Sequence, residues 1–192
     1  MSRTIRTFIG APLPEAYRAR LRELQDWLRP RLRSRLSFTR PESWHLTLRF
    51  LGDTDEELAR EGLPVALGEI AFEPFELQAG GGGFFPPRGV GRWRPRVAWV
   101  GLVRGAEACR ALAAAVSSAV APLGFPPEDR PYSPHLTLAR IKRAEDDRWD
   151  DALAHMDKQQ WPPVAVERIV LWRSELTAAG PKHTALAEFP AR

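Results

Sequence analysis

A nine-residue stretch occurs twice in the chain, first as Arg40-Pro41-Glu42-Ser43-Trp44-His45-Leu46-Thr47-Leu48 and again as Arg130-Pro131-Tyr132-Ser133-Pro134-His135-Leu136-Thr137-Leu138. Seven of the nine positions are identical, and the copies lie 90 residues apart in a chain of 192. Internal repetition over such a distance indicates a duplicated structural unit. The sequence therefore predicts two similar halves with one copy of the stretch in each.

Each copy ends in the pattern His-x-Thr-x, with leucine in the intervening positions. Side chains at i and i+2 share one face of a strand, so His45 and Thr47 point one way, as do His135 and Thr137. A pseudo-twofold arrangement would bring both pairs into one cleft. Two imidazoles with an ordinary pKa near ~6.5 can supply one acid and one base at neutral pH. A duplicated motif with a purely structural role is the alternative.

Composition is that of an ordinary globular protein, with 44% hydrophobic and 27% charged residues. These values exclude wholesale disorder. The single cysteine, Cys109, excludes an internal disulfide and a four-cysteine zinc site, and it suits a reducing cytoplasm. Residues 1–10 do not read as a signal peptide, and no uninterrupted apolar run approaches the ~18 residues of a membrane helix. We therefore expect a cytoplasmic protein that acts without a membrane.

The net charge is +4, and the basic residues are 25 arginines and three lysines. Positive charge favours a polyanionic partner, and the arginine fork suits phosphate. Codon bias in a GC-rich genome is the competing explanation for the arginine content. The basic stretch at 29–40 leads into the first motif, and two interpretations stay open for it, an RNA guide or a solvated loop.

Strand-like and helix-like segments alternate along the whole chain. The pattern predicts strands at 3–9, 36–39, 45–51, 72–79, 97–102, 135–141, 164–172 and 184–189. It predicts helices at 14–28, at 107–120 and at 148–156, and a further helix that begins after a cap at Asp53 or Thr54. A flexible Gly/Pro-rich loop is predicted at 80–91. Short links between strands favour antiparallel pairing. We expect one α+β domain over 1–192, with two pseudo-twofold-related lobes, each an antiparallel-rich sheet with helices, around a catalytic cleft.

With both motifs in view, the chain resembles the two-histidine phosphoesterase superfamily, and most closely its RNA 2′,3′-cyclic phosphodiesterases, historically called 2′-5′ RNA ligases. The resemblance spans the chain and rests on residues 6–10, 45–52, 124–125, 135–140 and 171–176. It implies a bilobal fold, catalysis without metal or cofactor, and substrates that are RNA ends with 2′,3′-cyclic phosphates or cyclic nucleotides. We expect a monomer.

The resemblance also implies a role for each site residue: catalysis by His45 and His135, phosphate binding by Thr47, Thr137 and Arg140, and nucleobase stacking by Phe50. Phe50 and Arg140 each lie five residues after their histidine, which is the wrong face by strand parity. The strand must bulge, twist or end there for these roles to hold. Otherwise Phe50 belongs to the core and Arg140 to the solvated surface.

The reaction expected is the opening of an RNA 2′,3′-cyclic phosphate to a 2′-phosphomonoester, with measurable 2′-5′ joining in reverse. His45 is favoured as the acid and His135 as the base, although the near symmetry of the motifs does not decide. The alternatives are a phosphodiesterase for small cyclic nucleotides or 2′-5′ oligonucleotides, a non-catalytic RNA-end binder and, disfavoured by the absence of a His-x-His pattern, a metal-dependent hydrolase. His155 is expected on the surface, and His183 in a turn no closer than the cleft rim.

Overall fold

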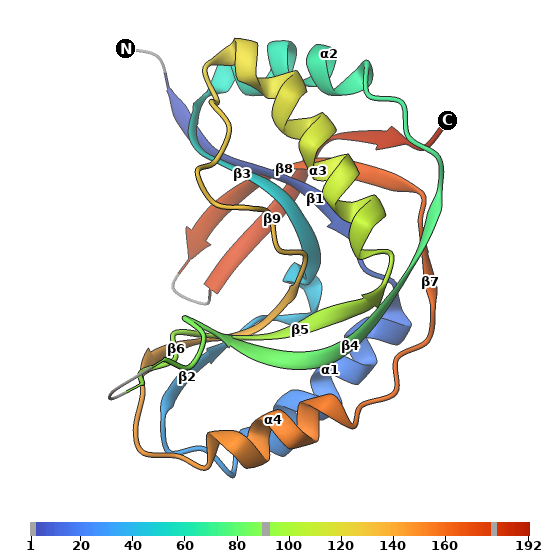
Figure 1. Cartoon of the computed structure of the whole chain (residues 1–192). Helices are drawn as coiled ribbons and strands as arrows, with labels where there is room; N and C mark the ends of the chain where they lie inside the picture. Colours follow the sequence, from blue (N-terminus) through green and yellow to red (C-terminus); the bar gives the residue numbers. More distant parts are fainter. Residues whose placement is uncertain (1–2, 90–92, 178–179) are drawn as a thin grey trace.

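Two antiparallel sheets form two lobes (Figure 1), and a cavity opens between them. The computed structural model describes residues 3–89, 93–177 and 180–192. One lobe holds a four-stranded sheet in the order β3-β1-β8-β9, and the other holds a five-stranded sheet in the order β2-β6-β5-β4-β7. The α+β class, the antiparallel pairing and the two lobes are as the sequence predicts.

The strands of the four-stranded sheet are β1 (Thr4–Pro12), β3 (His45–Asp55), β8 (Arg168–Thr177) and β9 (Gly180–Pro190). The strands of the five-stranded sheet are β2 (Arg35–Phe38), β4 (Phe75–Phe85), β5 (Val97–Arg104), β6 (Leu136–Arg143) and β7 (Val164–Val166). The helices are α1 (Glu15–Leu28), α2 (Leu63–Gly68), α3 (Ala106–Val120) and α4 (Trp149–Asp157), with short helical turns η1 (Pro41–Ser43), η2 (Leu58–Gly62) and η3 (Ala121–Leu123).

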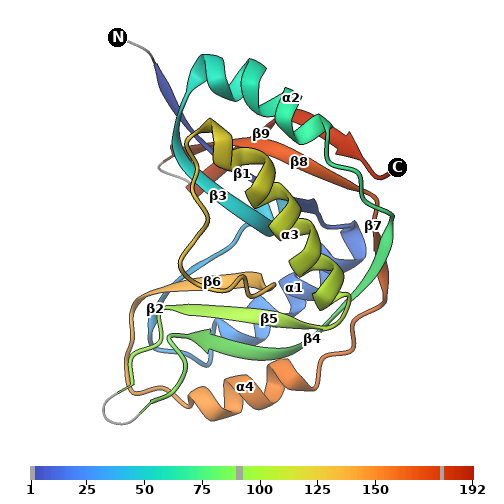
Figure 2. The same cartoon turned by 45° about the horizontal axis from the view of Figure 1, so that its top comes forward.

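The helices cover the faces of the sheets that lie away from the opening (Figures 1 and 2). Leu21 and Leu24 of α1 share a buried cluster with Leu138 of β6, so α1 packs on the five-stranded sheet although it directly follows β1. Leu112 and Val116 of α3 pack on the four-stranded sheet although α3 directly follows β5. Each lobe is therefore built from both halves of the chain. The expectation of one sequence half per lobe is wrong, while each lobe does carry one motif.

Helix α3 is long and rich in alanine. Within the described part of the chain, one helix, Ala106–Leu123, is long and apolar enough to cross a membrane by length and composition, with a mean hydropathy of 1.2. Glu107 and Arg110 interrupt its apolar run. Its buried residues pack against Ile5 and Ile9 of the sheet, as in a core helix. The thiol of Cys109 is also buried, which raises its pKa to about 12 and makes it a poor nucleophile.

The expected flexible loop at 80–91 is wrong over its first part, because β4 continues through the four glycines to Phe85. A Cβ atom at Gly82 would lie 2.6 Å from the Met156 side chain, and one at Gly83 would lie 2.1 Å from the Trp99 ring. Glycine is thus required here by close packing within a strand. The end of that predicted loop, at 90–91, lies outside the described residues.

The helix expected after an Asp53 or Thr54 cap begins slightly later than predicted. Strand β3 extends to Asp55, whose carboxylate accepts a hydrogen bond of 2.9 Å from the Leu58 backbone N–H. Thr54 is buried and bonds the Thr7 hydroxyl at 2.7 Å instead. The capping residue is therefore Asp55, and not Asp53 or Thr54.

Candidate active site

Strand β3 bulges directly after its His-Thr pair. Thr47 and Arg49 pair with adjacent residues of β1, so Leu48 is the extra residue on this strand. Leu48 and Arg49 are consecutive and both buried, and Phe50 emerges on the exposed side with 57% of its surface accessible. The bulge reverses the parity of the strand. Phe50 is therefore not a core residue, and it shares the face of His45 and Thr47.

Strand β6 carries the same irregularity at the matching position. Thr137 and Ala139 pair with adjacent residues of β5, which leaves Leu138 as the extra residue. Leu138 and Ala139 are both buried, and Arg140 is exposed. The bulge that the predicted roles of Phe50 and Arg140 require is present in both motifs.

Both histidines are oriented by the same local hydrogen bond. The Nδ1 atom of His45 lies 2.7 Å from the backbone carbonyl of Ser43, and that of His135 lies 2.8 Å from the carbonyl of Ser133. A carbonyl can only accept, so Nδ1 carries the proton and the neutral ring keeps its lone pair on Nε2. Each motif therefore presents one nitrogen for proton transfer.

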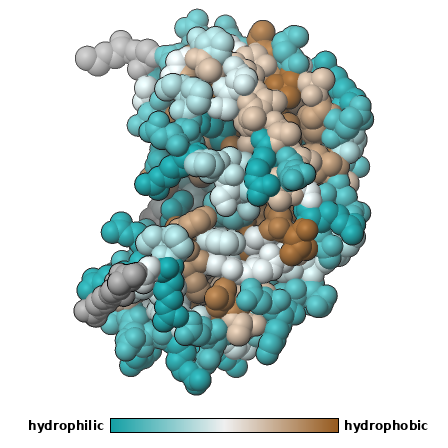
Figure 3. All heavy atoms as spheres, in the orientation of Figure 1, coloured by the Kyte–Doolittle hydropathy of each residue, from teal (hydrophilic) through white to brown (hydrophobic). Residues whose placement is uncertain are grey.

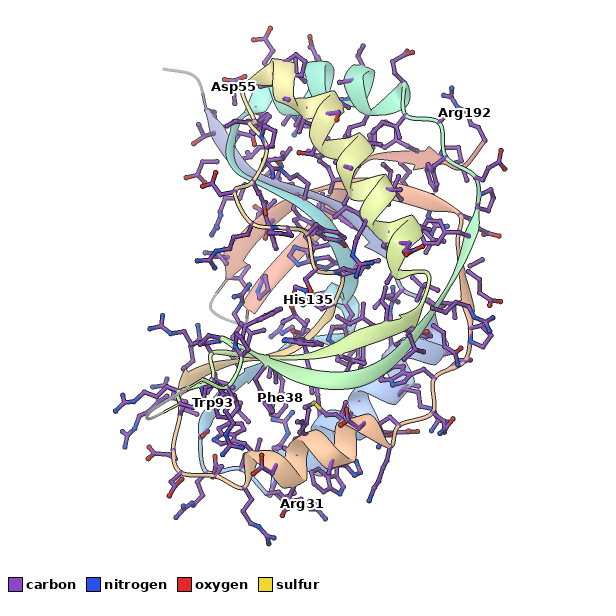
Figure 4. All side chains as sticks on the ribbon, viewed as in Figure 1. Arg31, Phe38, Asp55, Trp93, His135 and Arg192 are labelled. Carbon is purple, nitrogen blue, oxygen red and sulfur yellow. The ribbon has the colours of Figure 1, made fainter. Side chains whose placement is uncertain are left out.

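A cavity of about 660 Å³ lies between the two sheets. Five of the six predicted site residues line it, namely His45, Thr47, Phe50, Thr137 and Arg140. The sixth, His135, is not among its lining residues; it lies at the start of β6, two residues before Thr137, and Figure 4 places it between the two sheets. In the space-filling view the surface recedes between the lobes on the left-hand side (Figure 3).

The charged side chains that line this cavity in the described part of the chain are all basic: Arg6 from one sheet, and Arg140 and Lys142 from the other. Hydroxyl groups of serine and threonine supply further donors on both sides. The same described residues contain no group of three or more His, Cys, Asp and Glu side chains placed to hold a metal ion. The cavity is thus suited to an anion with several acceptor oxygens.

His45 lies in a cage of three rings. Its ring stacks on Phe8 at 4.5 Å, lies 5.5 Å from Trp172, and meets His183 edge-on at 5.3 Å. Burial lowers the pKa of His45 to about 4, the Ser43 carbonyl works against this shift, and the neighbouring His183 adds to it. His45 is consequently neutral at pH 7 in the unliganded protein.

His135 is less enclosed than His45. Its neighbours are Phe85, edge-on at 5.1 Å, and Trp99 at 6.2 Å. Burial also lowers the pKa of His135, the Ser133 carbonyl opposes the shift, and the charge of Arg140 adds to it. The empty cleft therefore contains two neutral imidazoles, and an anionic ligand would raise the pKa of both.

A sequence profile of the 2′-5′ RNA ligase superfamily matches residues 13–178, most of the chain and both motifs. The chain belongs to this superfamily. Its relatives include the RNA 2′,3′-cyclic phosphodiesterase of Methanothermobacter thermautotrophicus, 33% identical over 188 residues, which are 96% of this chain and 98% of the relative. The protein of the same name from Thermus thermophilus is 36% identical over 190 residues, 98% of this chain and 91% of the relative.

Two solved structures that are similar to this chain have the same fold. The crystal structure of TT0787 of Thermus thermophilus superposes with a TM-score of 0.75 at 34% identity and covers 97% of this chain and 98% of its own. Escherichia coli LigT, crystallised with 3′-AMP, gives a TM-score of 0.76 at 24% identity, with coverage of 98% and 99%. The latter likeness concerns the fold alone.

In this member of the 2′-5′ RNA ligase superfamily, His183 is the cleft residue that sequence reasoning missed. It lies on β9, lines the cavity, and contacts Phe8 at 4.8 Å as well as His45. Its Nδ1 atom is buried without a hydrogen-bond partner, and burial lowers its pKa. His183 has no counterpart in the repeat, so the sequence contained no signal for it.

Within the basic stretch at 29–40, Arg31 and Arg33 lie away from the cavity, whereas residues 37–39 line it. Arg31 lies over the Trp27 ring at 4.4 Å, and His155 stacks on the same ring at 3.8 Å. Figure 4 shows Arg31 near α4, at the far end of the lobe from His135. The Arg33 backbone N–H donates to the Asp147 carboxylate at 2.9 Å. These arginines brace the outer side of the five-stranded lobe.

Three contacts tie the segment that carries the second motif to the strand that carries the first. The Tyr132 hydroxyl donates to the Thr47 carbonyl at 2.7 Å. Arg49, which the bulge turns inward, bonds the Pro126 carbonyl and pairs with Glu128 at 3.1 Å. The segment that leads to His135 is thus fastened to the strand that bears His45.

Proposed function

We propose that this protein hydrolyses the 2′,3′-cyclic phosphate end of RNA to a 2′-phosphomonoester. The observation that carries the proposal is the pair of bulged His-x-Thr strands, one from each lobe, at a cavity whose described charged lining is entirely basic. Relatives that share a third of their residues over the whole chain are named RNA 2′,3′-cyclic phosphodiesterase. Both lines of support point to a cyclic phosphodiester as the substrate.

The reaction needs one neutral and one protonated imidazole. The neutral ring accepts a proton from water as the water oxygen forms a bond to phosphorus in line with the 3′ oxygen. The bond from phosphorus to the 3′ oxygen breaks, and that oxygen takes a proton from the other ring. The hydroxyls of Thr47 and Thr137 and the guanidinium of Arg140 hold the non-bridging oxygens, where charge grows in the transition state.

We assign His45 as the acid and His135 as the base. The acid must carry a proton before the reaction starts. In the unliganded protein the first proton taken up resides mainly on His135, because His45 is the more deeply buried ring. The deeper burial of His45 therefore works against its assignment as the acid. An anionic phosphate beside His45 restores its proton affinity. A 5′-hydroxyl group in place of water would form a bond to the same phosphorus as the bond to the 3′ oxygen breaks, and the product would be a 2′-5′ phosphodiester that joins two RNA ends.

We further infer that one chain suffices, since both motifs come from it, and that the reaction takes place in the cytoplasm without a metal ion. The two motifs offer two histidines and two hydroxyls, too few strong ligands for a catalytic divalent ion. Activity in excess EDTA is the expected result. Loss of activity in EDTA with recovery on addition of Mn²⁺ or Zn²⁺ would overturn metal independence.

The deciding experiment incubates the protein with an RNA that ends in a 2′,3′-cyclic phosphate, in EDTA, and identifies the product ends. A 2′-phosphomonoester supports the proposal. Turnover of 2′,3′-cyclic mononucleotides or 2′-5′ oligonucleotides with the RNA left intact would favour the related phosphodiesterase. Binding of the RNA without turnover of any of these substrates would indicate a non-catalytic binder.

A further inference from the structure

Strand β6 continues along the cleft beyond Arg140 and carries a second cation. Arg140 and Lys142 are both exposed and both line the cavity, while Ile141 between them is buried. The bulge at Leu138 turns Arg140 to the cavity, and Lys142, the extra residue opposite Arg35 and Leu36 of β2, lines the same cavity. Donors thus follow one another along β6, starting beside His135.

Arg140 and Lys142 differ in their ion pairing from Arg143, the next basic residue on the strand. The ion pairs found among the described residues include neither Arg140 nor Lys142, whereas Arg143 pairs with Glu145 at 2.6 Å. Across the cleft, Arg6 of β1 also lines the cavity, and its closest carboxylate, Asp53, lies at 3.9 Å with both side chains largely exposed. Basic groups from both lobes therefore face the cavity without a close carboxylate.

Same-face residues on a strand are about 6.6 Å apart. This spacing is comparable with the step from one phosphate to the next along an RNA strand. A cyclic phosphate held at Arg140 would thus place the phosphate on the 5′ oxygen of the same nucleotide within reach of Lys142. A nucleoside cyclic phosphate without a 5′-phosphate leaves Lys142 without a ligand.

We propose that Lys142, with Arg6 opposite, forms a subsite for the 5′-phosphate of the terminal nucleotide and so makes the cleft selective for cyclic phosphate ends of RNA strands over free nucleoside cyclic phosphates. The inference rests on the proposed function and goes beyond it by naming the group that distinguishes the two substrates. Lys142 contacts no reacting atom in this scheme. Its contribution is confined to substrates that carry the second phosphate.

The test uses two substrates that differ in one group, adenosine 2′,3′-cyclic phosphate with and without a 5′-phosphate. The wild-type protein should have the higher kcat/KM for the 5′-phosphorylated substrate. Lys142→Ala should lower that value by about three- to fivefold, as for an exposed ion pair, and spare the other substrate. Lys142→Arg should keep the preference. Arg143→Ala is the matched control, an exposed neighbour already paired with Glu145, and should change neither value.

Equal loss on both substrates in Lys142→Ala, or an unchanged preference, would overturn the subsite. Failure of the wild-type protein to hydrolyse both nucleotides and an RNA with a 2′,3′-cyclic phosphate end would instead overturn the proposed function. In that event calorimetric binding of adenosine 5′-phosphate to the wild-type and Lys142→Ala proteins still decides the subsite. Weaker binding to the variant supports it, and equal binding refutes it.

Discussion

The strands β3 and β6 have the same framework and different surroundings. Each has a leucine bulge after its His-Thr pair, and each fixes the histidine Nδ1 with a carbonyl two residues earlier. They diverge from the fourth residue after the histidine, which is Arg49 on one strand and Ala139 on the other, and the fifth residue is Phe50 on one and Arg140 on the other. The comparison teaches that the repeat preserves two equivalent positions for proton transfer. The exposed residue that follows each bulge is apolar on one strand and charged on the other, and on the proposed function these contact a base and a phosphate respectively.

Loss of either histidine is the largest expected effect and tests the equivalence of the two strands. His45→Ala and His135→Ala should each lower kcat by about 10²–10⁴-fold, the range for general acid–base catalysis. The double variant should be little worse than either single variant because the pair acts as a unit. Single-turnover rates on a cyclic nucleotide measure this. Near wild-type turnover in either single variant would contradict the equivalence of the two histidines.

Arg140 should matter to every substrate, because the reacting phosphate is common to all. Arg140→Ala removes charge-assisted hydrogen bonds of about 1.5–3 kcal/mol and should lower kcat/KM by about 10–100-fold. The measurement compares adenosine 2′,3′-cyclic phosphate with a cyclic phosphate that has no base, such as glycerol 1,2-cyclic phosphate. Loss on the nucleotide alone would contradict a phosphate contact.

Phe50 should behave in the opposite manner on the same two substrates. Phe50→Ala should raise KM for the nucleotide by about tenfold through lost base stacking and should leave the base-free substrate unchanged. Val65→Ala, which removes another exposed apolar side chain on a distant helix, is the control. An equal rise in KM for both substrates would indicate that Phe50 stabilises the strand and does not stack on the base.

The pH dependence of kcat/KM tests how the surroundings of His45 and His135 affect their pKa values. Productive protein has one ring protonated and one neutral, so kcat/KM should fall below a pKa of about 4 and again above the other pKa, which lies below 6.5. The two limbs belong to the coupled pair. His183→Phe keeps a ring beside His45 but removes a charge that lowers the pKa of His45, so the acidic limb should move slightly upward. A maximum of kcat/KM above pH 7 would contradict the burial of both rings.

The repeat explains why so much of the site could be predicted. His45 and His135 were identified because their contexts match, and the bulges followed from the positions of Phe50 and Arg140. His183 has no such match, and its place beside His45 depends on β9 pairing with β8. The glycines before Phe84 read as a loop because glycine disfavours strands, but packing against Met156 and Trp99 outweighs that preference. Which sheet each helix covers is likewise set by tertiary packing and leaves no local signal.

The order of the strands has a consequence for synthesis on the ribosome. The strands of the five-stranded sheet have all emerged by Val166, yet β1 and β3 must wait for β8 and β9 to complete the four-stranded sheet. Trp172 and His183, which both contact the His45 ring, therefore emerge after every strand of the five-stranded sheet. A nascent chain holds His45 in an unfinished sheet until β9 has emerged. Chains that lack β8 and β9 should accordingly be inactive even though both motifs are present.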